Sequence, residues 1–449
     1  MWKAEKPSPF PQTVHIPFTS GWKSKTLVGK RRYRVFHTLP GPYYFYCNKF
    51  NKRAAQTFLP HDIHPIQGAQ TAPPPMKGRN ILKIICDKTL LGAAIDGVSR
   101  AVTLRSTIPV LEGILLKAEG FNLTLTGYDM ELGIVTTIEA NVLEPGDIVL
   151  NAKLLSDMVR RMPAGQISIS SADNGKTTIQ GGVAQFEIQS MPASDFPQLP
   201  NTGAEETMTI KTGVFREMVE RTLYAVSQDE KRPAHTGELF EIQPNHLTVV
   251  ALDGFRLAIV ERKVEASKEI RIIVPGKTMN EVLRLLANDD EAEVHISANR
   301  RYIVFNTAGY TIMSRLIEGE FLNYKNVIPE GYRTQVVLDT KGFIETIERA
   351  SLIITERLKN PLRITFTEGK VIVRCQTSLG RVVDEFAAGC EGEEVEIGFN
   401  NRYLLDALRN ARTEQVRIQL SGPLSPVKIL PAEGEDFLYL VLPVRFRND

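Results

Sequence analysis

A threefold internal repeat constrains the fold of this chain more than any other feature of its sequence. The segment AKLLSDMVRRMP at residues 152–163 recurs as GKTMNEVLRLLA at 276–287 and as NRYLLDALRNAR at 401–412. In each copy the apolar residues fall on one face at helical spacing, and a strand-like run precedes the copy. Because long repeats of this kind mark tandem structural units, the sequence predicts three similar domains.

A second helical segment repeats in step with the first, at residues 91–102, 215–226 and 343–354. Between the two helical segments of each copy, apolar and polar residues alternate with a period of two, which is typical of a strand, a turn and a second strand. We therefore predict an α+β fold in which each domain packs two helices on antiparallel sheets.

The spacing of the copies also predicts the domain boundaries. We expect domain 1 over residues 80–205, domain 2 over 206–331 and domain 3 over 332–449. Similar units joined in series present similar faces, and such a chain closes most simply as a symmetric dimer of two copies. The repeat alone does not distinguish a closed ring from an open array.

Residues 1–75 have a different character from the repeats. They hold eleven Lys/Arg against two Asp/Glu, many prolines and no apolar periodicity. We interpret them as a disordered arm or an extension that is absent from the native protein. A basic tail that contacts DNA is one alternative, and upstream codons before a true start at Met76 are the other, which we favour.

The charge of the remaining chain is unevenly distributed. Residues 76–449 hold 43 basic and 50 acidic residues, whereas the six helical segments hold twelve basic and eight acidic ones. For a single helix, charges on its exposed face are ordinarily just solvated. Six such helices lining one face would instead make a positive surface that holds a polyanion without reading its sequence. The basic residues concerned are Arg100, Lys153, Arg160, Arg161, Arg216, Arg221, Lys277, Arg284, Arg349, Arg402, Arg409 and Arg412.

Motifs of enzymes, cofactor sites and metal sites are not found. The sequence has no glycine-rich phosphate loop, no dinucleotide fingerprint and no nucleophile elbow. Its four cysteines have neither metal-site nor disulfide-framework spacing, and we read them as buried free thiols. Asp129 and Asp253 occupy equivalent repeat positions, which predicts that each caps a turn rather than acting as a catalytic carboxylate. We expect no cofactor, no metal and no membrane span.

Several motifs resemble those of one family, the bacterial DNA sliding clamp, which is the β subunit of DNA polymerase III. They are RSTIPVLEGILL from Arg105, LTLTGYDMEL from Leu123, SMPASDFPQLP from Ser190, VALDGFRLAIV from Val250 and the C-terminal YLVLPVRF. The resemblance covers nearly all of residues 80–449. It implies a cytoplasmic, non-catalytic homodimeric ring that encircles double-stranded DNA, slides on it, and tethers the replicative DNA polymerase. It also implies a clamp loader and other proteins with a clamp-binding motif as partners.

The resemblance assigns functional positions in this sequence. DNA-facing positions would be Arg105, Lys153, Arg160, Gln228, Arg232 and Lys277. Gln228 and Arg232 lie in a loop whose length departs from the family pattern. The dimer contact would bring Phe186 and Ile188 of one chain against Leu352 and Ile353 of the other, although taken singly all four could be ordinary core residues.

A hydrophobic pocket between domains 2 and 3 would bind short peptides of the partner proteins. The matching positions are Leu252, Gly254, Phe255, Arg256, Leu257, Leu322, Asn326, Val327, Pro426, Leu440, Leu442, Pro443, Val444 and Arg445. Asn326, where the family often has a basic residue, and the tail 447–449 depart from the common pattern. Apolar anchors in a cleft are how short peptides gain affinity, but a run such as LVLPV is by default a buried strand. A scaffold that never encircles DNA remains the alternative to a sliding clamp.

Overall fold

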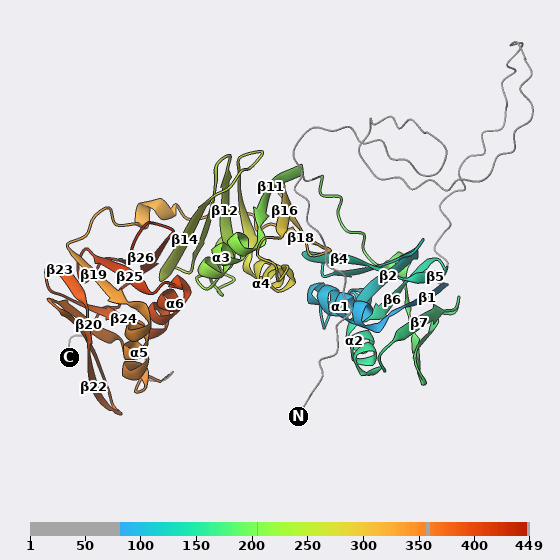
Figure 1. Cartoon of the computed structure of the whole chain (residues 1–449), viewed down its shortest axis with the longest axis horizontal. Coiled ribbons are helices and arrows are strands. Elements are labelled where there is room, and N and C mark those ends of the chain that lie inside the picture. The colour runs from blue at the N-terminus through green and yellow to red at the C-terminus, as the bar shows by residue number, and fades with distance from the viewer. Residues whose placement is uncertain (1–80, 204, 356–359, 447–449) are drawn as a thin grey trace, which may run out of the picture. The chain divides into compact units, whose positions relative to one another are not determined.

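The computed structural model describes residues 81–203, 205–355 and 360–446. The predictions for residues 1–75, for Cys47 and for the tail 447–449 lie outside the described residues. Within them, the chain forms three tandem domains of two helices and antiparallel sheets, which confirms the predicted α+β architecture (Figure 1).

The first domain contains ten strands and two α-helices. They are β1 (Leu82–Asp87), α1 (Lys88–Val98), β2 (Gly113–Glu119), β3 (Asn122–Tyr128), β4 (Leu132–Glu139), β5 (Asn141–Glu144), β6 (Gly146–Asn151), α2 (Ala152–Arg161), β7 (Gln166–Ser171), β8 (Lys176–Gly181), β9 (Ala184–Gln189) and β10 (Met191–Pro192). The 3₁₀ turns η1 (Ser99–Ala101) and η2 (Pro109–Glu112) lie between α1 and β2, and η3 (Ala193–Asp195) follows β10.

The second domain repeats the pattern. It contains β11 (Glu205–Lys211), α3 (Thr212–Leu223), η4 (Pro233–Thr236), β12 (Gly237–Gln243), β13 (His246–Leu252), β14 (Arg256–Lys263), β15 (Ile270–Pro275), α4 (Gly276–Leu285), β16 (Glu293–Ala298), β17 (Tyr302–Thr307) and β18 (Tyr310–Arg315). The turn η5 (Tyr324–Val327) lies in the segment that leads to the third domain.

The third domain completes the series. It contains β19 (Thr334–Asp339), α5 (Thr340–Ser351), β20 (Leu362–Thr367), β21 (Lys370–Thr377), β22 (Gly380–Ala387), β23 (Gly389–Gly392), β24 (Val395–Phe399), α6 (Asn401–Ala411), β25 (Gln415–Leu420), β26 (Val427–Pro431) and β27 (Phe437–Val441).

Two of the four sheets cross a domain boundary. β4 of domain 1 pairs with β18 of domain 2, and β14 of domain 2 pairs with β27 of domain 3, so each junction continues a nine-stranded sheet. The two outer sheets run in the orders β5-β1-β7-β8-β9 and β22-β21-β20-β24. β9 and β22 are therefore edge strands among the described residues.

The helices pack in pairs, α1 on α2, α3 on α4 and α5 on α6, and α3 also contacts α6. The helices α1, α3 and α5 each begin three residues before the segments predicted from the repeat. Asp87 explains the shift in α1, because its carboxylate accepts hydrogen bonds from the amides of Thr89 (2.7 Å) and Leu90 (3.1 Å). Asp339 caps α5 in the same way through the amide of Gly342.

The prediction for the two turn aspartates is confirmed. Asp129 Oδ1 accepts the amides of Glu131 and Leu132 at 3.0 and 2.7 Å. Asp253 Oδ1 accepts the amides of Phe255 and Arg256 at 2.9 and 3.1 Å. Each aspartate closes the hairpin turn between two strands with its own side chain.

Candidate functional site

The basic surface of domain 1 is centred on α2. Lys153 and Arg160 are exposed on this helix, and both line a cavity of about 260 Å³. Leu104, which is 78% exposed, borders the same cavity, and the exposed Arg105 follows it. The structure thus brings three of the predicted DNA-facing positions into one part of domain 1.

The helices as observed carry the predicted excess of positive charge, twelve Lys/Arg against eight Asp/Glu. Within the described residues, eight of these twelve cations are ion-paired. Lys153 has no ion pair in that part of the chain, whereas Lys277 contacts Asp129 of domain 1 at 2.7 Å. The two lysines begin equivalent helices but differ in their freedom to bind an anion.

Arg221 is a correction to the predicted basic surface. Arg221 is only 7% exposed. Its guanidinium lies 5.2 Å from the ring centroid of Phe437 and forms an ion pair with Glu217. Helical periodicity placed Arg221 on a polar face, but domain 3 covers that face. The arginine therefore belongs to the contact between domains 2 and 3.

The loop with Gln228 and Arg232 lies beside the predicted peptide pocket. Both residues are exposed, and a Cβ atom built on Gly254 would lie 3.6 Å from the Arg232 guanidinium. His235 follows in the turn η4, where burial and the nearby Arg232 charge lower its pKa. Arg232 therefore borders the predicted pocket at Gly254.

The floor of the predicted pocket is a row of leucines on three neighbouring strands. Leu252 of β13 pairs with Leu257 of β14, and Leu257 pairs with Leu440 of β27. All three are at most 3% exposed and pack with Phe321 and Tyr324 in one apolar cluster. The structure thus gathers residues from domains 2 and 3 on one face of the shared sheet.

The rim of the predicted pocket is more exposed than its floor. The amide of Leu442 donates to the carbonyl of Phe255 at 2.9 Å, which holds the C-terminal segment against the β13–β14 turn. The exposed fractions of the apolar rim residues are 56% for Phe255, 45% for Leu322, 41% for Val327, 37% for Leu442 and 38% for Val444. Gly254, Asn326 and Arg445 are exposed, and Pro426 and Pro443 are half-buried.

Arg256 differs from the other predicted pocket residues because its side chain is only 9% exposed. Its Nε contacts Asp253 Oδ2 at 2.9 Å, and its Nη1 contacts Asp406 Oδ2 of α6 at 2.5 Å. Its guanidinium also lies 5.3 and 5.0 Å from the ring centroids of Tyr224 and Tyr403. Every contact of this guanidinium therefore lies within the junction of domains 2 and 3.

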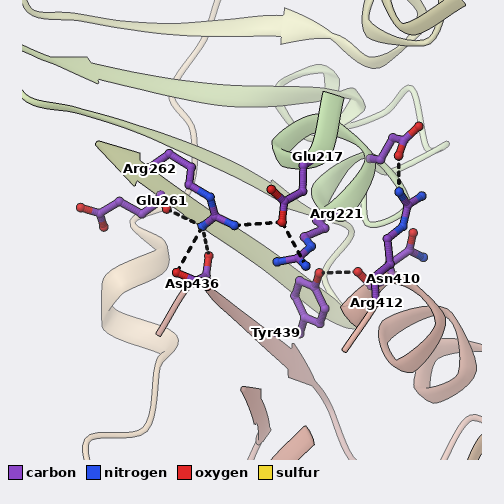
Figure 2. A network of polar contacts seen from close by, with 9 residues as sticks. Glu217, Arg221, Glu261, Arg262, Asn410, Arg412, Asp436 and Tyr439 are labelled. Atoms are coloured by element: carbon purple, nitrogen blue, oxygen red, sulfur yellow. Dashed lines mark hydrogen bonds and ion pairs between the residues drawn. The ribbon is translucent and has the colours of Figure 1, made fainter. Parts of the chain in front are cut away.

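A second set of contacts at this junction was not found from the sequence (Figure 2). Arg262 of β14 donates to Glu217 at 3.0 Å and to the carbonyl of Asp436 at 2.9 Å. Tyr439 donates its hydroxyl to the carbonyl of Asn410 at 3.0 Å and stacks on Phe437. The partners in each of these hydrogen bonds are 29 or more positions apart in the sequence, and the repeat provides no signal for them.

A buried carboxyl group lies beneath α3. Glu238 of β12 is 0% exposed, and its Oε1 lies 2.5 Å from the hydroxyl of Thr222 on α3. Burial raises the pKa of Glu238 to about 8, and the Thr222 hydroxyl opposes this shift. Thr222 Oγ1 also lies 3.0 Å from the carbonyl of Met218, so its single hydroxyl proton is shared between that carbonyl and Glu238 Oε1.

The predicted dimer residues lie on β9 and at the C-terminal end of α5, a helix that contacts β22. Phe186 (38% exposed) and Ile188 (half-buried) belong to the edge strand β9. Leu352, which is 81% exposed, caps the C-terminus of α5, and the half-buried Ile353 follows it. Phe186 and Leu352 are thus more exposed than ordinary core residues.

Three further observations bear on the kind of site. A cavity of about 530 Å³ lies in domain 2, with Leu239, Ile273 and Phe321 in its wall, and it does not coincide with the predicted pocket. In residues 81–203, 205–355 and 360–446, no group of three or more potential metal ligands is present. No helix in these ranges is long and apolar enough to cross a membrane.

Comparison with known sequence families gives three matches, one for each domain. The N-terminal domain of the DNA polymerase III beta subunit matches residues 82–200, its central domain matches 209–323 and its C-terminal domain matches 325–445. The beta sliding clamp of Halalkalibacterium halodurans is 32% identical over an alignment of 379 residues that covers 81% of this chain and 100% of that protein. The beta sliding clamp of Bacillus subtilis is 29% identical over 377 residues, with the same coverage of 81% and 100%.

Solved structures agree with the sequence matches. A putative DNA polymerase III beta subunit from Eubacterium rectale superposes with a TM-score of 0.79 at 32% identity, covering 81% of this chain and 99% of that one. The DNA polymerase sliding clamp of Bacillus subtilis superposes with a TM-score of 0.80 at 28% identity, covering 82% and 100%. The three tandem domains are thus also the architecture of these proteins.

Proposed function

This chain belongs to the DNA polymerase III beta subunit family, the beta sliding clamps, and from that premise we propose how its residues hold DNA, a second subunit and partner peptides. It is a DNA polymerase processivity factor and is not itself an enzyme. Members of the family act with DNA and DNA polymerase. We propose that this chain acts in the cytoplasm.

Ring closure is supported by one observation in particular: at both internal junctions, the same two strands of the repeat pair across the domain boundary. The strands β4, β14 and β22 are equivalent in the repeat, as are β18, β27 and β9. β4 pairs with β18 and β14 pairs with β27, which leaves β22 and β9 as unpaired edges in the part of the chain that the structure describes. A second copy of the chain satisfies both edges, with Phe186 and Ile188 near the partner subunit's Leu352 and Ile353.

The experiment for ring closure is topological. The full-length protein is loaded on nicked circular DNA, and the circle is then cut at one site. A closed ring stays on the circle and slides off the linear form. Equal retention on both forms would support a scaffold that does not encircle DNA.

The DNA contacts are assigned to the exposed cations of the helical face. Lys153, Arg160 and Arg105 cluster in domain 1, and phosphate contacts of this kind carry no sequence readout. Gln228, Arg232 and Lys277 are assigned weaker contributions, because Arg232 borders the pocket and Lys277 is bound to Asp129. Replacing Lys153 by Ala should shorten the lifetime on circular DNA more than the matched change Lys277→Ala.

The leucine floor and its exposed rim form the proposed docking pocket for short apolar peptides of the replicative polymerase, the clamp loader and other clamp-binding proteins. The floor is buried and apolar and the rim supplies accessible apolar anchors, which is the arrangement by which short peptides gain affinity. Arg256 holds the pocket wall in place rather than contacting the peptide.

A substitution at the rim tests the pocket. Leu442→Asp should abolish polymerase stimulation and leave the dimer intact. Leu143→Asp is the matched control, because Leu143 is a 49% exposed leucine on β5 of domain 1. Equal loss of stimulation in both variants would remove the pocket assignment.

A further inference from the structure

The strand pairing at the two internal junctions follows one register. At the first junction, Ser314 pairs with Leu132 and Tyr310 pairs with Thr136. At the second, Val441 pairs with Arg256 and Phe437 pairs with Val260. Because Arg256 is the repeat equivalent of Leu132, and Val260 of Thr136, the two pairings are superimposable.

The hairpins of the outer sheets fix the equivalent positions on the two free edges. Thr307 pairs with Tyr310 across the β17–β18 turn, and Gly181 pairs with Ala184 across the β8–β9 turn, so Ala184 corresponds to Tyr310. In the β21–β22 hairpin Gln376 pairs with Arg381, and in the equivalent β3–β4 hairpin Tyr128 pairs with Gly133. Arg381 therefore corresponds to Gly133.

Applied to a second copy, the internal register predicts how β22 meets β9. We propose that, in the ring assigned above, Arg381 lies directly opposite the partner subunit's Glu187 and forms an intersubunit ion pair, with Val382 opposite the partner subunit's Phe186. This inference rests on the proposed ring and specifies the residue pairing within it.

The side chains fit this register on both faces of the strands. Ile188 and Val382 pack partly against the core, so the apolar residues of both edges point to the same side. Gly380, opposite the partner subunit's Ile188, has nothing within 4 Å of an added Cβ and leaves room for that side chain. A shift by one residue would turn one of these apolar faces toward water.

The charges on the outer face are complementary. Arg381 is exposed and has no ion pair within the described part of the chain. Glu187 is 47% exposed and contacts Lys176 of its own sheet at 2.7 Å, so its second oxygen can accept from a guanidinium. Opposite charges directly across two antiparallel strands attract, which favours this register over its neighbours.

Paired cysteines test the register in the full-length chain. The pair Glu187→Cys and Arg381→Cys places two thiols directly opposite, where Cβ atoms lie within reach of a disulfide. The control pair Glu187→Cys and Val383→Cys is offset by two residues on the same exposed face. We expect about tenfold more covalent dimer from the direct pair, because diagonal Cβ atoms lie too far apart.

Charge reversal provides a second readout that needs no cross-link. Glu187→Arg and Arg381→Glu should each weaken dimerisation by about threefold, and the double reversal should restore it. Failure of the double variant to recover affinity would contradict the ion pair.

Sedimentation of the unmodified chain distinguishes failure of the proposed strand register from failure of the proposed ring. If the unmodified chain is a dimer but the cysteine variants cross-link only through the offset pair, or through neither pair, the register is wrong and the ring is still supported. A chain that stays monomeric at every concentration overturns both.

Discussion

The two internal junctions share their backbone pairing but differ in their side chains. At the junction of domains 1 and 2, the ion pairs Lys277–Asp129 and Arg100–Glu281 include cations that are 62% and 31% exposed. At the junction of domains 2 and 3, Arg256 is 9% exposed and is held between two aspartates and two tyrosine rings. The anions Asp129 and Glu281 are only 10% and 16% exposed, so the two junctions differ in their cations: the first uses cations that reach solvent, and the second uses the desolvated Arg256.

The difference predicts unequal costs when a junction is broken. An exposed ion pair contributes little, because water and salt screen both charges. A buried one is costly to break, because the remaining charge stays desolvated without its partner. The second junction, which also adjoins the proposed peptide pocket, should therefore be the more sensitive to substitution.

The largest effect is expected from Arg256→Ala. The substitution leaves Asp253 and Asp406 without their shared cation, and we expect a loss of about 3 kcal/mol in the free energy of unfolding. Denaturant unfolding of the full-length chain measures it. A loss no greater than that of Lys277→Ala would remove the distinction between the two junctions.

A second large effect is expected from Glu238, which lies beneath the helix that supplies Arg221 and Glu217 to the second junction. Its folded pKa of about 8 lies above the ordinary value of 4.5, so the folded state holds the proton more tightly than the unfolded state. Stability associated with this group is therefore complete below about pH 4.5 and is lost as the pH rises to about 8.

Glu238→Gln removes the titration and keeps a hydrogen-bonding group. At pH 7 we expect a gain on the order of 3 kcal/mol in the free energy of unfolding, and a weaker dependence on pH between 5 and 8. The measurement is denaturant unfolding across that pH range. An unchanged pH profile would show that Glu238 is not the group that titrates.

The sequence predicted the repeated elements well, because each domain carries the same periodicities. The starts of α1 and α5 were misplaced because Asp87 and Asp339 precede the apolar pattern and act through capping. Arg221 was misassigned because periodicity identifies a polar face but not the domain that covers it. The turn role of Asp129 and Asp253 is local and was predictable, whereas the contact of Arg256 with Asp406 joins residues 150 positions apart.

A smaller effect should reveal how the subunit junction differs from both internal ones. Thr377 occupies the repeat position of Asp129 and Asp253, and its hydroxyl accepts the amide of Leu379 at 3.1 Å. At the first junction Asp129 contacts Lys277, whose repeat equivalent in domain 1 is Lys153. In the proposed ring, Thr377 would therefore face the partner subunit's Lys153. The subunit junction therefore lacks the carboxylate that joins domains 1 and 2.

Thr377→Asp should supply that carboxylate. We expect dimerisation to tighten by about fivefold, equivalent to about 1 kcal/mol, as measured by sedimentation at low salt. Thr377→Asn is the matched control, because it keeps the turn hydrogen bond without the charge. If both variants behave alike, the aspartate position does not link neighbouring domains.

The smallest effect is expected from Lys277→Ala at the first junction. Lys277 is 62% exposed, and Asp129, which is 10% exposed, keeps its hydrogen bonds from the amides of Glu131 and Leu132 when the lysine is removed. Loss of the contact should therefore lower the free energy of unfolding by only about 0.5 kcal/mol. The loss should shrink further in high salt, since screening weakens an exposed pair, whereas the loss from Arg256→Ala should persist. Denaturant unfolding of both variants at low and high salt makes the comparison. A salt-independent loss in Lys277→Ala would mean that this lysine contributes through packing of its aliphatic stem, and the first junction would then resemble the second more than its exposure indicates.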